Sequence, residues 1–141
     1  MDRKFLRQPS VDKLNEMSKN TISEVLGMEF TEVGENYIMA KMPVDKRTHQ
    51  PYGLLHGGAS VVLAETLGSV AAMLMVDPEK FYCVGLEINA NHIRGIKSGW
   101  VYGKSTPLHV GKSTQVWLIN ITNEREQLVC TSRITMAVIK K

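Results

Sequence analysis

The sequence predicts an α+β fold in which an antiparallel sheet wraps around one long central helix. The first observation is the stretch HGGASVVLAETLGSVAAMLM, residues 56–75, which is apolar over about five helical turns. The second is that the chain after Asp77-Pro78 reads as one strand after another, joined by short turns. The third is that the helix is apolar on almost every face, so the sheet must largely surround it. The 141 residues are enough for one domain, residues 1–141, with its own core.

The segment before the long helix carries signals for two short helices and a hairpin. Ser10 can cap a short amphipathic helix. Thr21 and Glu24 have the spacing of a capping box, and Gly27 can close that helical turn. Residues 28–44, MEFTEVGENYIMAKMPV, then alternate as two strands around a turn at residues 34–36.

Four strands are expected after the long helix, at residues 82–89, 101–109, 113–122 and 128–139. Their short connections are typical of an antiparallel sheet. Strict alternation in the first strand would place Tyr82, Val84, Leu86 and Ile88 on one face and Cys83, Gly85, Glu87 and Asn89 on the other.

Composition narrows the function classes. The formal net charge of +3 comes without a basic run or stripe, which argues against a nucleic-acid partner but suits a small anionic ligand. Cys83 and Cys130 lie in apolar stretches and show no metal spacing, so we expect reduced thiols, no metal site and no cofactor. The N-terminus lacks the apolar run of a signal peptide, and we expect a cytoplasmic protein. Residues 59–76 approach the length of a membrane span, but Glu65 argues against one.

Glu65 is the first candidate functional residue, because it stands in the middle of the apolar helix. A buried carboxylate needs partners or serves chemistry. Ser69, four residues on, lies on the same helical face and can hydrogen-bond it. The alternative is that Glu65 faces solvent at the edge of the helix.

The start of the helix is the second candidate site. His56-Gly57-Gly58 leaves free backbone N–H groups at the positive end of the helix dipole, where they could hold a developing oxyanion. The alternative is that the glycines only make the turn. Gly57 and Glu65 are eight residues apart, or roughly 12 Å along a helix axis. One carbonyl could therefore meet both groups only if they come from two chains, which predicts an isologous homodimer with shared sites.

The stretch QPYGLLHGGASVVLAETLGS, residues 50–69, resembles the acyl-CoA thioesterases of the hotdog fold. The branch in question carries a catalytic Glu on the central helix and acts on aromatic acyl-CoA substrates. The likeness continues through VGLEINANHIR, PLHVGKSTQVWLINI and SRITMAVI. It is greatest to the members that hydrolyse 1,4-dihydroxy-2-naphthoyl-CoA in menaquinone synthesis. The resemblance implies a hotdog fold, an acyl-CoA substrate and a dimer with a continuous sheet, commonly assembled into a homotetramer.

The resemblance also implies catalytic roles for residues on these motifs. The Gly57 N–H would bind the thioester oxygen with help from Gln50, and His56 would orient the thioester. Glu65 of the other subunit would attack the carbonyl or activate a water, two alternatives that the sequence leaves open. Ser69 would hold Glu65 or that water. A thioester has a good thiolate leaving group, so this chemistry requires no metal.

Coenzyme A would contact a second group of residues. Similar proteins use the segment holding His92 and Arg94 near the pantetheine and the nucleotide, and Arg94 suits a phosphate. Lys112 and Ser113 lie in a turn rich in N–H and hydroxyl donors that could cradle phosphates. The alternatives are an ordinary surface Arg and a plain hairpin turn, and His92 could face the acyl pocket instead of the pantetheine arm. Candidates for lining an apolar acyl pocket are Leu54, Leu55, Val61, Val62, Thr66, Met73 and Tyr82.

Three other functions remain as alternatives. The substrate could be a phenylacetyl- or hydroxybenzoyl-type CoA, or an acyl group on an aryl carrier protein, as in proofreading thioesterases. The chain could be a non-catalytic acyl-CoA-binding module, although a binder gains nothing from a carboxylate at the thioester. A hotdog dehydratase would need a different His-Glu arrangement, which the chain does not show.

Overall fold

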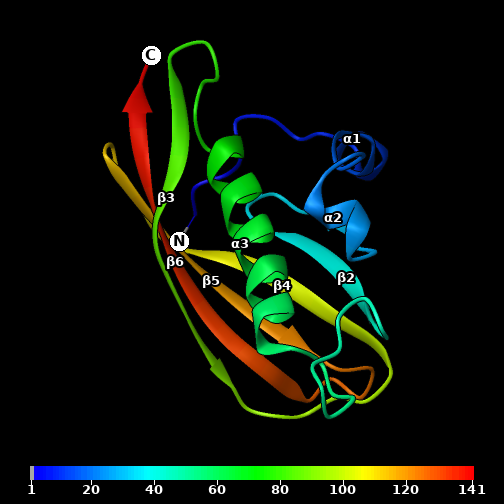
Figure 1. Cartoon of the computed structure of the whole chain (residues 1–141). Helices are drawn as coiled ribbons and strands as arrows, with labels where there is room; N and C mark the ends of the chain where they lie inside the picture. The colour runs from blue at the N-terminus through cyan, green and yellow to red at the C-terminus, as the bar shows by residue number, and fades with distance from the viewer. Residues whose placement is uncertain (1) are drawn as a thin grey trace.

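Helix α3 (Gly57–Leu74) lies across the concave face of one curved antiparallel sheet in the computed structural model, which describes residues 2–141 (Figure 1). The sheet holds six strands in the order β1-β2-β4-β5-β6-β3. The strands are β1 (Glu29–Val33), β2 (Ile38–Val44), β3 (Phe81–His92), β4 (Gly99–Val110), β5 (Thr114–Thr122) and β6 (Leu128–Lys140). The predicted α+β class and its central helix are confirmed, and so is the hotdog fold.

The core forms where α3 meets the sheet. Leu63, Leu67 and Ala71 of the helix are fully buried, and Trp117 and Ile134 meet them from the strands. Two glycines allow a close approach, because a Cβ at Gly103 would lie 2.6 Å from Leu67 Cδ1 and one at Gly68 would overlap Ile134 Cγ2. By length and composition α3 could cross a membrane, but half of it is buried against the rest of the chain.

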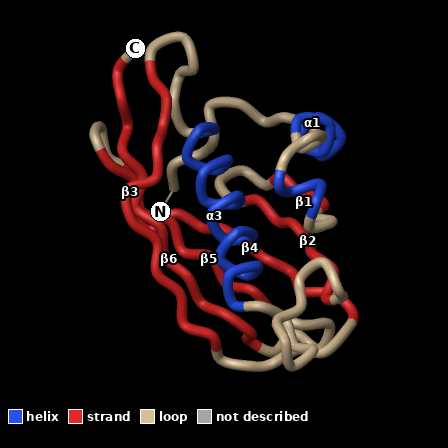
Figure 2. Tube along the Cα trace, viewed as in Figure 1, coloured by secondary structure: helices blue, strands red, loops and turns tan. Residues whose placement is uncertain are grey.

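The N-terminal segment folds over the helix side of the molecule, where α1 (Val11–Met17) and α2 (Ile22–Val25) lie (Figure 2). Ser10 caps α1 as expected, since its hydroxyl accepts a bond from the Lys13 N–H at 3.1 Å. Gly27 ends the α2 region with a φ of 71°, also as expected. The capping box is wrong: the Thr21 hydroxyl donates to the Ser18 carbonyl, and the Glu24 carboxylate accepts from the Asn20 N–H.

Strand β3 is an edge strand whose pattern departs from strict alternation. The register with β6 shifts between Gly85 and Glu87, so Leu86 is an extra residue in a bulge. Cys83 and Gly85 face the helix before the bulge, whereas Ile88 and Ala90 pack on the core after it. The predicted grouping of four even-numbered residues on one face is therefore wrong, because one inserted residue reverses the alternation.

Candidate active site

The N-terminus of α3 presents one free backbone donor. His56 is the N-cap, and its Nδ1 accepts a bond from the Gly58 N–H at 2.7 Å. The His56 N–H in turn donates to the Thr48 carbonyl at 2.7 Å, which fixes the loop before the helix. Within residues 2–141 no acceptor takes the Gly57 N–H. The arrangement thus leaves Gly57 as the donor available to a ligand, at the positive end of the helix dipole.

A cavity of about 310 Å³ opens beside this donor. It brings together four residues that the sequence assigned to the site, namely Gln50, Gly57, His92 and Arg94. They come from the loop before α3, from the start of α3 and from the end of β3 and the segment after it. These segments meet at one end of the sheet (Figure 1).

His92 lies directly against Gly57. A Cβ on Gly57 would be 2.8 Å from His92 Nε2, so only glycine leaves the imidazole in this position. Beside them, Ser60 lines the same cavity and is almost fully buried. Sequence reasoning missed Ser60, although its spacing of three residues from Gly57 puts both on one helical face.

The loop before α3 is held by its own polar contacts. The Thr48 hydroxyl is buried and donates to the Pro43 carbonyl at 2.7 Å. The Arg47 guanidinium hydrogen-bonds Asp45 and lowers the pKa of that carboxyl to about 2. Gln50 closes the loop further, since its N–H donates to the Leu54 carbonyl at 2.8 Å. The Gln50 side chain therefore stands on an ordered loop at the cavity.

The cavity carries positive charge and no acidic side chain among its lining residues. Arg94 is exposed at its rim, and within the described chain its guanidinium has no hydrogen-bond or ion-pair partner. A cation without a partner at the mouth of a small cavity suits a phosphate or another anion.

Glu65 lies apart from this cavity, about two turns further along α3. It is exposed, so the expectation of a buried carboxylate is wrong for the single chain. Its Oε1 lies 3.7 Å from the position that a Cβ on Gly85 would occupy, which places the carboxylate over β3. Within residues 2–141 it has no hydrogen-bond partner. The Ser69 hydroxyl points instead toward Met136 Sδ at 3.9 Å, so the expected Ser69–Glu65 bond is absent from this chain.

Lys112 and Ser113 lie at the opposite end of the sheet from the cavity. The Ser113 carbonyl accepts a bond from the Val138 N–H, and Val138 pairs with Cys83, near the start of β3. His92 is nine residues further along that strand, or roughly 30 Å away. One chain therefore does not bring these two residues to the other predicted coenzyme A contacts.

The seven predicted acyl-pocket residues are divided by the fold. Leu54 and Leu55 line the cavity beside Gly57. Thr66 and Met73 line a second, larger cavity beneath the N-terminal segment. Tyr82 alternates with the helix-facing Cys83 and so lies on the outer face of the sheet, which makes its assignment to the pocket wrong.

The two thiols are free and lie on neighbouring strands, with Cys130 buried and Cys83 half-buried. Burial raises the pKa of both thiols. Within residues 2–141 no cluster of three or more His, Cys, Asp or Glu side chains could hold a metal ion.

Comparison with known proteins assigns the family. The model of the thioesterase superfamily matches residues 52–130. A Vibrio cholerae protein is 60% identical over 92% of this chain and 85% of its own length. Its name, "putative esterase", gives no substrate. The 1,4-dihydroxy-2-naphthoyl-CoA hydrolase of Escherichia coli is 48% identical over 94% of this chain and 97% of that enzyme. The proofreading thioesterase EntH of Cronobacter turicensis is 47% identical over 94% of this chain and 96% of its own length.

A solved structure agrees with these relatives. The crystal structure of a mutant thioesterase from Pseudomonas aeruginosa superposes with a TM-score of 0.95 at 47% identity, covering 97% of this chain and 99% of that one. The chain belongs to the thioesterase superfamily and is a hotdog-fold thioester hydrolase.

Proposed function

We propose that the protein hydrolyses an aromatic acyl-CoA, with 1,4-dihydroxy-2-naphthoyl-CoA as the first substrate to test. The observation that carries this proposal is the cavity where the free Gly57 N–H, Gln50, His92 and the unpaired Arg94 converge. The 48% identity to an enzyme named for that substrate supports the choice of acyl group. The 47% identity to a proofreading thioesterase favours an aryl carrier protein as the second candidate donor.

In this reaction the thioester oxygen accepts a bond from the Gly57 N–H, whose helix dipole stabilises the charge that develops there. Gln50 assists on the same oxygen. His56 keeps the donor available by capping Gly58 instead. Arg94 binds a phosphate of coenzyme A, and His92 packs beside the pantetheine arm. The coenzyme A thiolate then leaves without a metal.

Glu65 supplies the carboxylate that attacks the thioester carbon or activates a water, but from the partner chain. Within one chain Glu65 is exposed and lies roughly 12 Å along the helix from Gly57. The free edge of β3 is twelve residues long and carries exposed Val84 and Leu86. Antiparallel pairing of two such edges about a twofold axis sets the start of one β3 beside the end of the other. Each chain's Glu65, Lys112 and Ser113 then approach the cavity of the other chain.

The test is release of free thiol from a panel of aryl- and alkyl-CoA thioesters and an aryl carrier protein. We expect aromatic thioesters to turn over, and Glu65→Gln to lower kcat by roughly 10²- to 10⁴-fold because it removes the base or nucleophile. Glu79→Gln is the matched control, since Glu79 is an exposed acid in the loop after α3.

The relative rates rank the donors. Equal, slow release by the native protein and by the Glu65→Gln variant would contradict the catalytic role of Glu65 and favour an acyl-CoA-binding module. A preference for the carrier-bound acyl group would identify a proofreading enzyme.

A further inference from the structure

The N-terminal arm, defined here as residues 5–23, is fastened to the body of the protein. The Leu6 N–H donates to the Leu74 carbonyl at 2.9 Å, and the Phe5 ring stacks on Trp117 at 6.1 Å between centroids. Asn15 makes two bonds with the backbone of Phe30, at 2.8 and 3.2 Å, which tie α1 to β1. The arm is therefore a fixed wall over α3.

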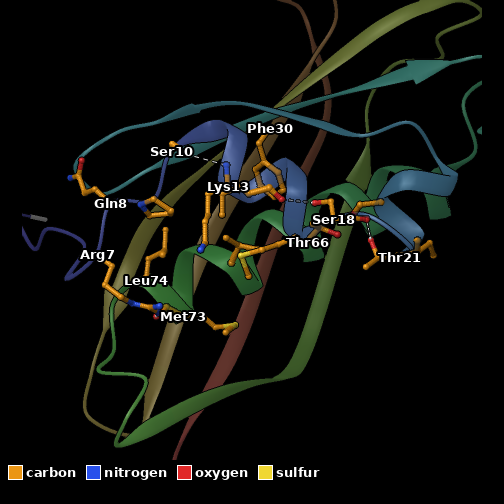
Figure 3. Close-up of a pocket in the computed structure, with 16 residues that line it drawn as sticks. Arg7, Gln8, Ser10, Lys13, Ser18, Thr21, Phe30, Thr66, Met73 and Leu74 are labelled. Atoms are coloured by element: carbon orange, nitrogen blue, oxygen red, sulfur yellow. Dashed lines mark hydrogen bonds between the residues drawn. The ribbon is translucent and has the colours of Figure 1, made fainter.

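A cavity of about 650 Å³ lies between this arm and α3 (Figure 3). Its lining is mainly apolar, with Met17 and Phe30 on one side and Val70, Met73 and Leu74 on the other. This volume is in the range of a site for a small organic ligand and exceeds what a single aromatic ring fills.

The lining contains two cations and no acidic side chain. The Arg7 guanidinium donates to the Met73 carbonyl at 2.8 Å, so it caps the C-terminal end of α3. Lys13 points from α1 toward α3 (Figure 3), and within residues 2–141 its ammonium has no hydrogen-bond or ion-pair partner. The bond from its N–H to Ser10 holds its backbone in place.

The cavity adjoins the face of α3 that carries Glu65. Thr66, Val70 and Met73 line the cavity and form one stripe on the helix at spacings of four and three residues. Glu65 and Ser69 form the neighbouring stripe. The Thr66 hydroxyl donates to the Val62 carbonyl at 2.7 Å and is not free for a ligand. When the thioester carbonyl lies at Glu65, the ring system of the acyl group can thus extend across an apolar surface toward Lys13.

We propose that this cavity receives the acyl group and that Lys13 selects for an anionic or strongly hydrogen-bond-accepting substituent at the end remote from the thioester. The inference rests on the proposed function and makes it more specific. Among aromatic acyl-CoA substrates, the site then favours a bicyclic or larger apolar body with a polar far end. It ranks such substrates above 1,4-dihydroxy-2-naphthoyl-CoA, whose two hydroxyl groups both lie on the ring that bears the thioester. Lys13 does not touch the reacting atoms, so it is a specificity-determining residue and acts on substrate binding.

The test compares 2-naphthoyl-CoA with 6-carboxy-2-naphthoyl-CoA, whose added carboxylate lies at the far end of the ring system. We expect native protein to prefer the carboxylated substrate about tenfold in kcat/KM, as for one charge-assisted hydrogen bond. Lys13→Met should abolish the preference through a higher KM for the carboxylated substrate, with kcat nearly unchanged. Lys13→Arg should keep most of it.

The matched control is Lys19→Met, which removes the same charge from the same arm. Lys19 pairs with Glu16 at 2.8 Å and does not line the cavity, so this variant should keep the native preference. A Lys13→Met enzyme with the same preference as Lys19→Met overturns the inference.

A binding measurement separates this inference from the proposed function. If no thioester is hydrolysed, the proposed function fails, and binding of 1-anilinonaphthalene-8-sulfonate, a naphthalene with an anionic group, is then titrated by fluorescence. Binding weakened about tenfold in Lys13→Met but not in Lys19→Met supports the site. Equal binding by the two variants overturns it.

Discussion

Because Gly57 contacts His92, a substitution at residue 57 can test the site through its effect on activity, separately from any effect on protein stability. A methyl group at this position would lie 2.8 Å from His92 Nε2 and would displace the imidazole from the cavity. Gly57 is not among the glycines with a positive φ, so its backbone accepts alanine. A Gly→Ala change at such a position stabilises by roughly 0.4–1 kcal/mol, because it restricts the unfolded chain. We therefore expect Gly57→Ala to keep or slightly raise the melting temperature while kcat/KM falls about 10- to 100-fold.

Calorimetry measures the melting temperature and thiol release measures kcat/KM, both on the same Gly57→Ala preparation. The double variant Gly57→Ala, His92→Ala is the control, because it removes the collision without restoring the imidazole. It should remain impaired if His92 contacts substrate. Native kcat/KM in the single variant would contradict the placement of substrate beside Gly57.

The packing of α3 on the sheet depends on glycine in the middle of the helix. Gly68 is buried, and a Cβ there would overlap Ile134 Cγ2 on β6. Overpacking of this kind costs about 1–3 kcal/mol, which outweighs the gain of roughly 1 kcal/mol in helix propensity. We expect Gly68→Ala to lower the free energy of unfolding, measured by urea denaturation.

A double-mutant cycle with Ile134→Ala checks whether the overlap with Ile134 causes the loss of stability in Gly68→Ala. Removing Cγ2 makes room for the new methyl group, so Ile134→Ala should cost less stability in the Gly68→Ala background than alone. Additive costs would mean that the overlap with Ile134 is not the source of the destabilisation.

At the scale of elements, the sequence predicts what is locally encoded. Ser10, Gly27 and the stop at Asp77-Pro78 mark ends of helices through their own backbone preferences, and the structure places these ends close to them. The bulge at Leu86 escaped prediction because apolar residues continue at every second position through it, from Tyr82 to Ile88. Gly85 is a local signal there, since an isolated glycine in a strand often marks a bulge.

At the scale of the whole molecule, the candidate site also combines residues that motifs identify with features that depend on distant segments of the chain. Gln50, Gly57, His92 and Arg94 could be assigned from motifs, and the fold brings them to one cavity. The sequence left the exposure of Glu65 as one of two alternatives, because the exposure depends on which flank of α3 the sheet leaves open. The cavity beneath the N-terminal arm could not be predicted from the sequence, because its walls come from segments about fifty residues apart along the chain.

The separation of Glu65 from Gly57 makes a prediction about the assembly. If each site takes its donor from one chain and its carboxylate from the other, a Gly57→Ala chain and a Glu65→Gln chain complement one another. A mixed dimer then has one site with both groups intact and one site with both altered. Random mixing makes half of the dimers mixed, so the mixture should recover about a quarter of the native activity.

The complementation is measured by unfolding and refolding the two variants together, with each variant refolded alone as the control. Thiol release from an aromatic acyl-CoA is compared at equal protein concentration. Activity that stays at the average of the two separate variants would mean that each chain holds a complete site. Recovery toward a quarter would place the carboxylate and the oxyanion donor on different chains, as the roughly 12 Å of helix between them requires.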